Sequence, residues 1–180
     1  MGFYWQFSVK KDDKGRITIP GEYKEVLNSE YNGCKLAITH GFVRQNCLVV
    51  HPDKVWVRKI QKLLKSKEGK KNPRELNILK RYLMSNTYLK QLDNNGKILI
   101  PQILWEKIGV NDKKGGREII IVGNFDSFEI WDAKEWERYN QATKEKIEKS
   151  FISEADLEIF EKLDVESITT FEGEYEDQNI

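Results

Sequence analysis

The feature that most constrains the fold of this chain is a nine-residue stretch that occurs twice. Residues 12–20 read DDKGRITIP, and residues 93–101, which lie 81 positions further along, read DNNGKILIP. Each copy sets an acid, a glycine and a base before an alternating apolar run, which is typical of a tight turn that enters a strand. Gly15 and Gly96 can adopt the positive φ that such turns often need. We therefore expect one strand–turn–strand unit to be present twice.

The repetition extends well beyond the turn. Both halves predict the same order of elements: strand, turn, strand, short helix, two strands and a helix. Trp56 and Trp136 lie 80 positions apart, at equivalent places in the helix that follows the fourth strand. The offset between the two copies is 81 residues at the turn and 80 at the tryptophans. This near-constant offset indicates duplicated modules of one topology. We predict an α+β chain that consists of a first domain (1–65), a linker and connecting helix (66–85), a second domain (86–150) and an acidic C-terminal extension (151–180).

The individual elements follow from apolar periodicity and from turn residues. The stretch 66–73 is polar, contains Gly and Pro, and is typical of a linker or long loop. In the extension we expect a helix over 154–163, capped by Ser153 and Asp156, and disorder over 164–180. The predicted strands are 3–11, 17–19, 35–39, 47–50, 87–92, 98–100, 119–122 and 128–131, and the predicted helices are 22–27, 55–64, 74–84, 103–108 and 133–149, the last one capped by Asp132.

The net charge of +1 conceals a strong asymmetry along the chain. Residues 54–90 hold twelve Lys and Arg against two acids, whereas residues 150–180 hold ten acids against one base. This distribution favours a body that binds a polyanion and a tail that repels or mimics a polyanion. A solvated helix followed by a disordered end explains the same charges equally well. Charge alone leaves both interpretations open.

Several classes of protein are disfavoured by what the sequence lacks. Its apolar runs are shorter than the roughly 18 residues of a membrane span, and no signal peptide is recognisable. Cys34 and Cys47 form no CxxC pair, so an intracellular, reduced protein is the default. His40 and His51 are not at metal-ligand spacing with the cysteines. Without a phosphate loop, nucleophile elbow or paired catalytic set, we expect no enzyme, no metal and no cofactor.

The first turn carries residues suited to nucleic acid. Its tip bears Lys14 and Arg16, and Lys10 and Lys11 precede it on the strand, so the turn can enter a major groove and contact phosphates. Asp12, four residues before Arg16, is placed to hold the guanidinium in one orientation. The alternative interpretation is that Asp12 and Arg16 form an ordinary surface ion pair that only shapes the turn.

The duplicated turn, with its Ile-x-Ile-Pro strand and its matching flanks, resembles the MraZ family over about residues 1–145. The resemblance implies two AbrB-type swapped-hairpin domains. It also implies a bacterial regulator of transcription that binds short direct repeats in DNA upstream of the division and cell-wall gene cluster. Members of the family form ring-shaped homo-oligomers. A cytoplasmic, nucleoid-associated protein that binds double-stranded DNA, without membrane contact or small-molecule substrate, is therefore expected.

In that family the turns face DNA, and the Arg of each turn makes the main contact. The first turn of this chain matches the pattern fully, but in the second turn Lys97 replaces the Arg. A lysine is a point charge, whereas the planar fork of an arginine can grip a guanine edge with two hydrogen bonds. We therefore expect Arg16 to read bases and Lys97 to hold a phosphate. The predicted DNA-binding residues are Lys10, Asp12, Lys14, Gly15 and Arg16, together with Asp93, Asn95, Gly96 and Lys97.

Two other uses of such a chain remain open. One is a protein-interaction module, in which the basic helices and the acidic tail dock protein partners. The other is an antitoxin-like protein, which binds both DNA and a toxin. A single domain with a disordered toxin-binding tail would favour the antitoxin, and two copies in one chain disfavour it.

Overall fold

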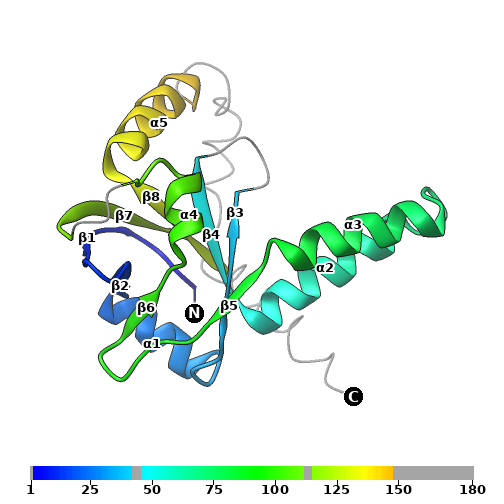
Figure 1. The fold of residues 1–180 in the computed structure, drawn as a ribbon, viewed down its shortest axis with the longest axis horizontal. Helices are drawn as coiled ribbons and strands as arrows, with labels where there is room; N and C mark the ends of the chain where they lie inside the picture. The colour runs from blue at the N-terminus through cyan, green and yellow to red at the C-terminus, as the bar shows by residue number, and fades with distance from the viewer. Residues whose placement is uncertain (1, 42–45, 112–114, 148–180) are drawn as a thin grey trace, which may run out of the picture. The chain divides into compact units, whose positions relative to one another are not determined.

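A computed structural model describes residues 2–41, 46–111 and 115–147 of the chain (Figure 1). The fold is α+β and is built mostly from antiparallel strands. Residues Met1–Trp136 form one compact unit, and Glu137–Ile180 form another. The helix predicted for 154–163 and the disorder predicted for 164–180 lie outside the described residues.

In the described part of the chain, eight strands form two sheets. A six-stranded sheet has the order β1-β7-β8-β4-β3-β5, and β2 and β6 form a separate two-stranded ribbon. All of these pairings are antiparallel. The strand bounds are β1 Gln6–Lys11, β2 Arg16–Thr18, β3 Leu36–His40, β4 Cys47–Pro52, β5 Tyr88–Lys90, β6 Lys97–Leu99, β7 Arg117–Asn124 and β8 Ser127–Asp132.

Each predicted strand between residues 3 and 131 corresponds to an observed one, but the first strand is shorter than expected. The alternation of aromatic and polar residues predicted a strand from residue 3, whereas β1 begins at Gln6. Trp5 has a φ of 69°, which interrupts an extended strand. Phe3 makes an isolated bridge with Phe125 instead.

The helices lie close to their predicted positions. Their bounds are α1 Gly21–Ser29, α2 Asp53–Lys67, α3 Pro73–Ser85, α4 Gln102–Lys107 and α5 Ala133–Lys146. Asp132 caps α5 as predicted, because its Oδ1 accepts hydrogen bonds from the backbone N–H groups of Lys134 and Glu135 at 3.1 and 3.4 Å. The part of the predicted last helix beyond residue 147 lies outside the described residues.

The linker or long loop predicted for 66–73 is shorter in the structure, where residues 68–72 connect two helices. The helix α2 runs to Lys67, and α3 begins at Pro73. Asn72 and Glu75 form a capping box: the Asn72 side chain accepts from the Glu75 N–H at 2.9 Å, and the Glu75 carboxylate accepts from the Asn72 N–H at 3.2 Å. Pro73 suits the first position of a helix, where its missing N–H is not needed. A short connection thus joins α2 and α3 into a hairpin (Figure 1).

The two sequence repeats are interleaved in the sheet. The strands β1 to β4 of the first repeat correspond to β5 to β8 of the second, and exchanging the repeats leaves the order β1-β7-β8-β4-β3-β5 unchanged. Thus β1 pairs with β7, β5 pairs with β3, and β4 pairs with β8 across the centre. The ranges 1–65 and 86–150 describe the sequence repeats, and their ability to act as separate domains stays a prediction.

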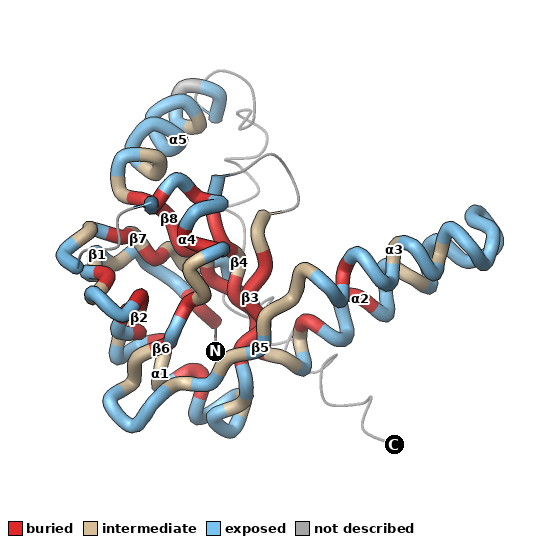
Figure 2. Tube along the Cα trace, in the orientation of Figure 1, coloured by how far each residue is buried: buried red, intermediate tan, exposed pale blue. Residues whose placement is uncertain are grey.

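One apolar core joins both repeats (Figure 2). Its largest fully buried members include Trp105, Tyr23 and Phe3, and both ribbon strands contribute a buried isoleucine. A smaller cluster forms where α2 and α3 meet β3, and it consists of Ala37, Trp56, Ile60 and Leu83. The first repeat and the second therefore bury their apolar faces against each other.

The two equivalent tryptophans make equivalent contacts across the repeats. Trp56 Nε1 donates to Thr87 Oγ1 at 3.1 Å, and Trp136 Nε1 donates to Gln6 Oε1 at 3.1 Å. Thr87 and Gln6 are themselves 81 positions apart and therefore occupy equivalent places in the two repeats. Thr87 directly precedes β5, and Gln6 begins β1, so each tryptophan donates to the start of the first strand of the other repeat. The match between Trp56 and Trp136 in the sequence therefore reflects a real pseudo-twofold relation in the fold.

Candidate nucleic-acid interface

The two predicted turns meet at the β2/β6 ribbon. In this antiparallel pair Arg16 lies opposite Leu99, and Thr18 lies opposite Lys97. Successive side chains of a strand point to opposite faces. Ile17 and Ile98 therefore face the core, where both are fully buried, while the four other residues form an outer face. The ribbon thus carries the base of each turn on one solvent-facing surface.

Asp12 organises the first turn. Its Oδ1 accepts hydrogen bonds from the backbone N–H of Lys14 at 3.1 Å and from that of Arg16 at 2.8 Å. Its Oδ2 accepts from Nε of Arg16 at 2.9 Å. Burial opposes ionisation of the carboxyl, but the bonds and the charge of Arg16 outweigh burial and lower the pKa of Asp12 below its usual 3.8. Asp12 therefore stays ionised and both shapes the turn and orients the guanidinium.

Asp93 organises the second turn in the same way. Its Oδ1 accepts from the backbone N–H of Asn95 and of Lys97, both at 2.9 Å. In both turns the glycine N–H also donates to the carbonyl of the first aspartate, at 3.1 Å for Gly15 and 2.9 Å for Gly96. The local hydrogen bonding explains why an acid, a glycine and a base recur at fixed spacing.

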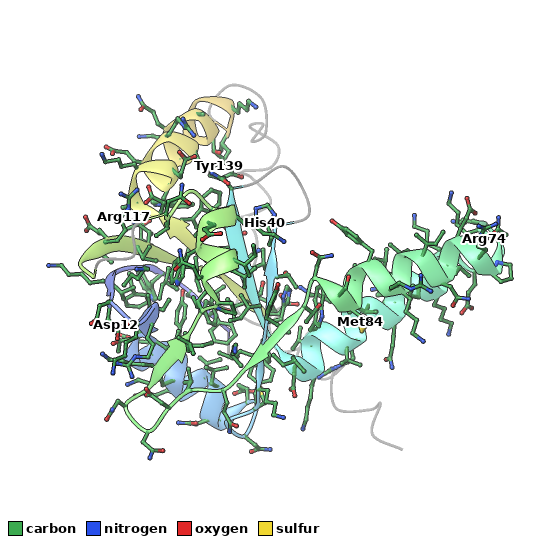
Figure 3. The ribbon with its side chains drawn as sticks, in the orientation of Figure 1. Asp12, His40, Arg74, Met84, Arg117 and Tyr139 are labelled. Carbon is green, nitrogen blue, oxygen red and sulfur yellow. The ribbon has the colours of Figure 1, made fainter. Side chains whose placement is uncertain are left out.

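The carboxylates also link the two turns to each other. Nη1 of Arg16 lies 3.7 Å from Oδ2 of Asp93, and Nζ of Lys97 lies 3.6 Å from Oδ2 of Asp12. Figure 3 labels Asp12 at this site. These side chains are partly exposed, so each ion pair is worth little in stability, of the order of 1 kcal/mol or less. These ion pairs mainly fix positions, because the carboxylates of Asp12 and Asp93 hold the side chains of Arg16 and Lys97 at one site.

The glycines of the turns have the predicted conformation. Gly15 has a φ of +78° and Gly96 a φ of +70°, both in the left-handed region that favours glycine. The indole Nε1 of Trp105 donates to the carbonyl oxygen of Gly15 at 3.1 Å, and this contact is buried. Trp105 lies on α4 of the second repeat and supports the first turn. It escaped the sequence prediction because the two residues are 90 positions apart.

The other predicted site residues separate into two groups. The side chains of Lys14 and Asn95 are exposed at the tips of the turns. Lys10 is exposed on β1, where its partner on β7 is Glu118. Lys11, however, is only 1% exposed, which overturns the expectation that it contacts phosphates. The strand alternation that exposes Lys10 turns Lys11 inward, where its ammonium contacts the carbonyl of Asp12 at 3.4 Å.

Comparison with known proteins identifies the family. The family described as "MraZ protein, putative antitoxin-like" matches the chain twice, over residues 3–78 and 83–158. The chain belongs to the MraZ family. A protein of Shewanella violacea named transcriptional regulator MraZ is 32% identical over 140 residues, which is 78% of this chain and 86% of the relative.

Other relatives agree with this assignment. A transcriptional regulator MraZ of Shewanella amazonensis is 34% identical over 140 residues, again 78% of this chain and 86% of the relative. One from Shewanella oneidensis is 34% identical over 129 residues, which is 72% of this chain and 78% of the relative. The MraZ resemblance inferred from the duplicated turn is confirmed, and the two matched segments coincide with the two repeats.

The described part of the chain holds no arrangement typical of a metal centre. Among residues 2–41, 46–111 and 115–147, no group of three or more His, Cys, Asp and Glu side chains is arranged to hold a metal ion. Cys34 and Cys47 are both thiols rather than halves of a disulfide. Burial, aided by the charge of Glu129, raises the pKa of Cys47 to about 12, which keeps that thiol protonated. Across those same ranges, none of the helices has the length and apolarity to traverse a membrane.

The basic face of α2 is the remaining predicted surface. Arg58, Lys62 and Lys65 are exposed there, as the amphipathic pattern indicated. Lys59 is engaged elsewhere, because its Nζ lies 2.8 Å from Oδ1 of Asp126 and 3.2 Å from Nε2 of His51. A second DNA contact on this face stays a prediction.

Proposed function

We propose that this chain is a non-catalytic transcriptional regulator that binds double-stranded DNA through the outer face of the β2/β6 ribbon and its two turns. One observation carries the proposal: the fold brings the two sequence-separated turns together, with Arg16 and Lys97 on one exposed face. The names of the relatives support regulation of transcription. The target that follows from the family resemblance is a set of short direct repeats upstream of the division and cell-wall gene cluster.

The ribbon has the right form for a major groove. The groove of B-DNA is about 12 Å wide and admits a two-stranded ribbon. The buried isoleucines anchor the inner face of the ribbon, so the outer face is presented on a rigid support.

We assign different roles to the two basic residues. Nε of Arg16 is bonded to Asp12, which leaves its two terminal nitrogens for a base edge. The 3.7 Å contact of Nη1 with Asp93 is longer than a hydrogen bond and is readily exchanged for a guanine. Lys97 contacts a backbone phosphate as a point charge. Lys10, Lys14 and Asn95 are further contacts at the edges of this surface.

The interleaved arrangement of the strands supports the swapped-hairpin type of fold that the resemblance implies. Each repeat contributes its first strand to the third strand of the other repeat, through the β1–β7 and β5–β3 pairs. We propose that the two repeats form one swapped-hairpin barrel within a single chain. A single isolated repeat would leave strand edges unpaired, which is unfavourable for a small sheet.

We further propose that the protein acts as a homo-oligomeric ring, in the cytoplasm and at the nucleoid. An apolar groove of about 300 Å³ on the α2/α3 hairpin supports contact with a second copy, since a groove of this kind is costly to leave in water. Ile78, Tyr82 and Met84 are more than two-fifths exposed on α3. Figure 3 labels Met84 on this helix. The groove is lined by Trp56, Lys59, Ile60, Leu63, Leu79, Tyr82 and Leu83.

Light scattering after size-exclusion chromatography tests this assembly. The groove variant Leu63→Glu is expected to lower the molar mass of the particle, because a buried charge at a contact is strongly unfavourable. Gln61→Glu adds the same charge to an exposed position on α2 outside the groove lining and is expected to leave the mass unchanged. A wild-type monomer would contradict the ring, and an oligomer whose mass is unchanged by Leu63→Glu would contradict the role of the groove.

An antitoxin-like protein is the second candidate, and the description of the MraZ family as antitoxin-like favours it. A protein-docking module and a DNA-binding regulator differ in their affinity for polyanions. On heparin, a DNA-binding protein is expected to elute at high salt, because many cationic contacts release counterions together. Elution of the natively folded protein at low salt would favour protein docking over the regulator.

The decisive experiment is a selection of DNA sequences from randomised duplexes with the purified protein. Short direct repeats are the expected outcome, and the division-cluster upstream region is expected to contain them. Fluorescence anisotropy then compares the selected duplex with a scrambled one at salt concentrations from about 50 to 200 mM. Equal affinity for both duplexes, or no enrichment of any sequence, would refute sequence-specific regulation.

A further inference from the structure

The supports of the two turns are exchanged between the repeats. Trp105 on α4 of the second repeat covers Gly15 in the first turn, with its Nε1 bonded to the Gly15 carbonyl. Lys24 on α1 of the first repeat covers Gly96 in the second turn. Lys24 and Trp105 are 81 positions apart, as are the two glycines. The same structural position is therefore occupied by an indole at one turn and by a cation at the other.

Lys24 lies very close to the backbone of the second turn. A Cβ placed on Gly96 would stand 2.8 Å from Cδ of Lys24 and 3.1 Å from its Nζ. The side chain is thus laid against Gly96, and its partial burial restrains the stem. A restrained lysine loses less conformational entropy when its ammonium binds an anion than a freely rotating one does.

The ammonium of Lys24 differs from the other bases of the ribbon in its partners. Arg16 is paired with Asp12 and Asp93, and Lys97 is paired with Asp12. In the part of the chain that the structure describes, no ion pair or side-chain hydrogen bond engages the Lys24 ammonium. The carboxylates of Asp12 and Asp93 already serve the other two cations. Lys24 is consequently a restrained positive charge beside a turn that faces solvent.

We propose that Lys24 is a phosphate-binding residue of the second turn, where it and Lys97 hold the DNA backbone from the two sides of Gly96. The inference rests on the proposed function of the ribbon. With this role for Lys24, the two turns contribute differently to DNA binding. The first turn, supported by the neutral Trp105, presents Arg16 to the bases, and the second turn fixes the register of the ribbon through two lysines from different repeats.

The alternative is that Lys24 only fills the space beside Gly96 with its stem. Lys24→Met separates the two roles, because methionine keeps an unbranched apolar stem and removes the charge. Lys24→Arg keeps the charge and is the rescue variant. Lys35→Met is the matched control, since Lys35 is an exposed lysine outside the ribbon and its turns. Thermal unfolding of each variant verifies that the fold is retained, and Lys24→Gln replaces Lys24→Met if the latter does not fold.

The readout is the salt dependence of binding to the selected duplex and to random duplex DNA. One phosphate contact contributes about 0.9 to the slope of log K against log salt. Lys24→Met is therefore expected to reduce the slope by about 0.9 for each engaged chain, which changes the ratio of wild-type to variant affinity about threefold to fourfold between 50 and 200 mM salt. The preference for the selected duplex should stay unchanged, as expected of a phosphate contact.

The outcomes separate this inference from the proposed function. If Lys24→Met keeps the wild-type slope while Arg16→Ala abolishes sequence preference, the ribbon binds DNA and the role of Lys24 is wrong. If the wild type shows no DNA binding, the proposed function fails and this inference fails with it. A reduced slope for Lys24→Met, a restored slope for Lys24→Arg and a wild-type slope for Lys35→Met would support the phosphate contact.

Discussion

Replacing Arg16 by lysine tests the difference between the two turns most directly, because it gives the first turn the base that the second turn has. Lysine keeps the charge near Asp12 but loses the planar fork. A bidentate base contact is worth about 1–3 kcal/mol of discrimination, so the preference for the selected duplex over a scrambled one should fall about 5- to 150-fold for each engaged chain. Affinity for random DNA should change little, since the phosphate attraction depends on charge.

The fold should tolerate the change. Asp12 retains its hydrogen bonds from the backbone N–H of Lys14 and of residue 16, which define the turn independently of the guanidinium. The lost ion pair joins two partly exposed side chains, 31% and 23% accessible, so its removal should cost about 1 kcal/mol or less. Any large loss of binding would therefore reflect the DNA contact.

Anisotropy titrations of labelled duplexes at one fixed salt concentration measure both affinities. Lys97→Arg is the reciprocal variant, and we expect it to leave the sequence preference nearly unchanged because the second turn contacts phosphate. If Arg16→Lys retains the wild-type preference, Arg16 does not read bases. If Lys97→Arg alone alters the selected sequence, the roles assigned to the two turns are reversed.

Three further predictions concern the second turn, the core and the support of the first turn. Lys97→Ala should weaken binding to all duplexes by a similar factor and flatten the salt dependence by about 0.9 in the log–log slope, measured by anisotropy, and a selective loss for one sequence would contradict a phosphate role. Burial, and then the neighbouring Lys59, lower the pKa of His51 to about 4 in the folded chain. As the pH falls through about 6.5, His51 therefore binds a proton in the unfolded chain but not in the folded chain. Stability should therefore fall by about 2 kcal/mol from pH 7 to pH 5 in urea unfolding followed by tryptophan fluorescence, and His51→Phe should remove this component. Gly15→Ala should lower the free energy of unfolding by about 1–2 kcal/mol for its positive φ, and by more for the contacts at 3.3 Å. Gly69→Ala is the control, because Gly69 has a φ of +73° and no atom within 4 Å of an added Cβ, so it should lose only the conformational part. Equal losses in the two variants would show that the contact with Trp105 does not matter.

Local chemistry explains which features could be predicted from the sequence. The positions of α1 and α4, and of every strand within a few residues, follow from apolar periodicity and turn residues. The linker was overestimated because the capping box of Asn72 and Glu75 starts α3 earlier than the apolar stripe suggests. Lys11 was misplaced because the prediction did not apply strand alternation to the residue next to the turn.

By itself, the sequence determined the two turns, because their geometry depends on residues that are two to four positions apart. Asp12 and Asp93 bond backbone groups within their own turns, and Gly15 and Gly96 supply the positive φ. Their duplication was also visible directly. These local features, with the match of the whole repeat, were sufficient to indicate the MraZ family.

Only the tertiary structure decided which repeat each strand would join. Equivalent strands present nearly the same pairing edges, so the sequence does not distinguish pairing within a repeat from pairing between repeats. The fold pairs β3 with β4 and β7 with β8 within each repeat, and makes its other strand pairs between the repeats. This pairing buries both apolar faces in one core and places Arg16 beside Asp93 and Lys97 beside Asp12. The same exchange sets Trp105 against the first turn and Lys24 against the second. The physical reason is that these contacts join residues about 70 to 90 positions apart, a separation over which local periodicity carries no information.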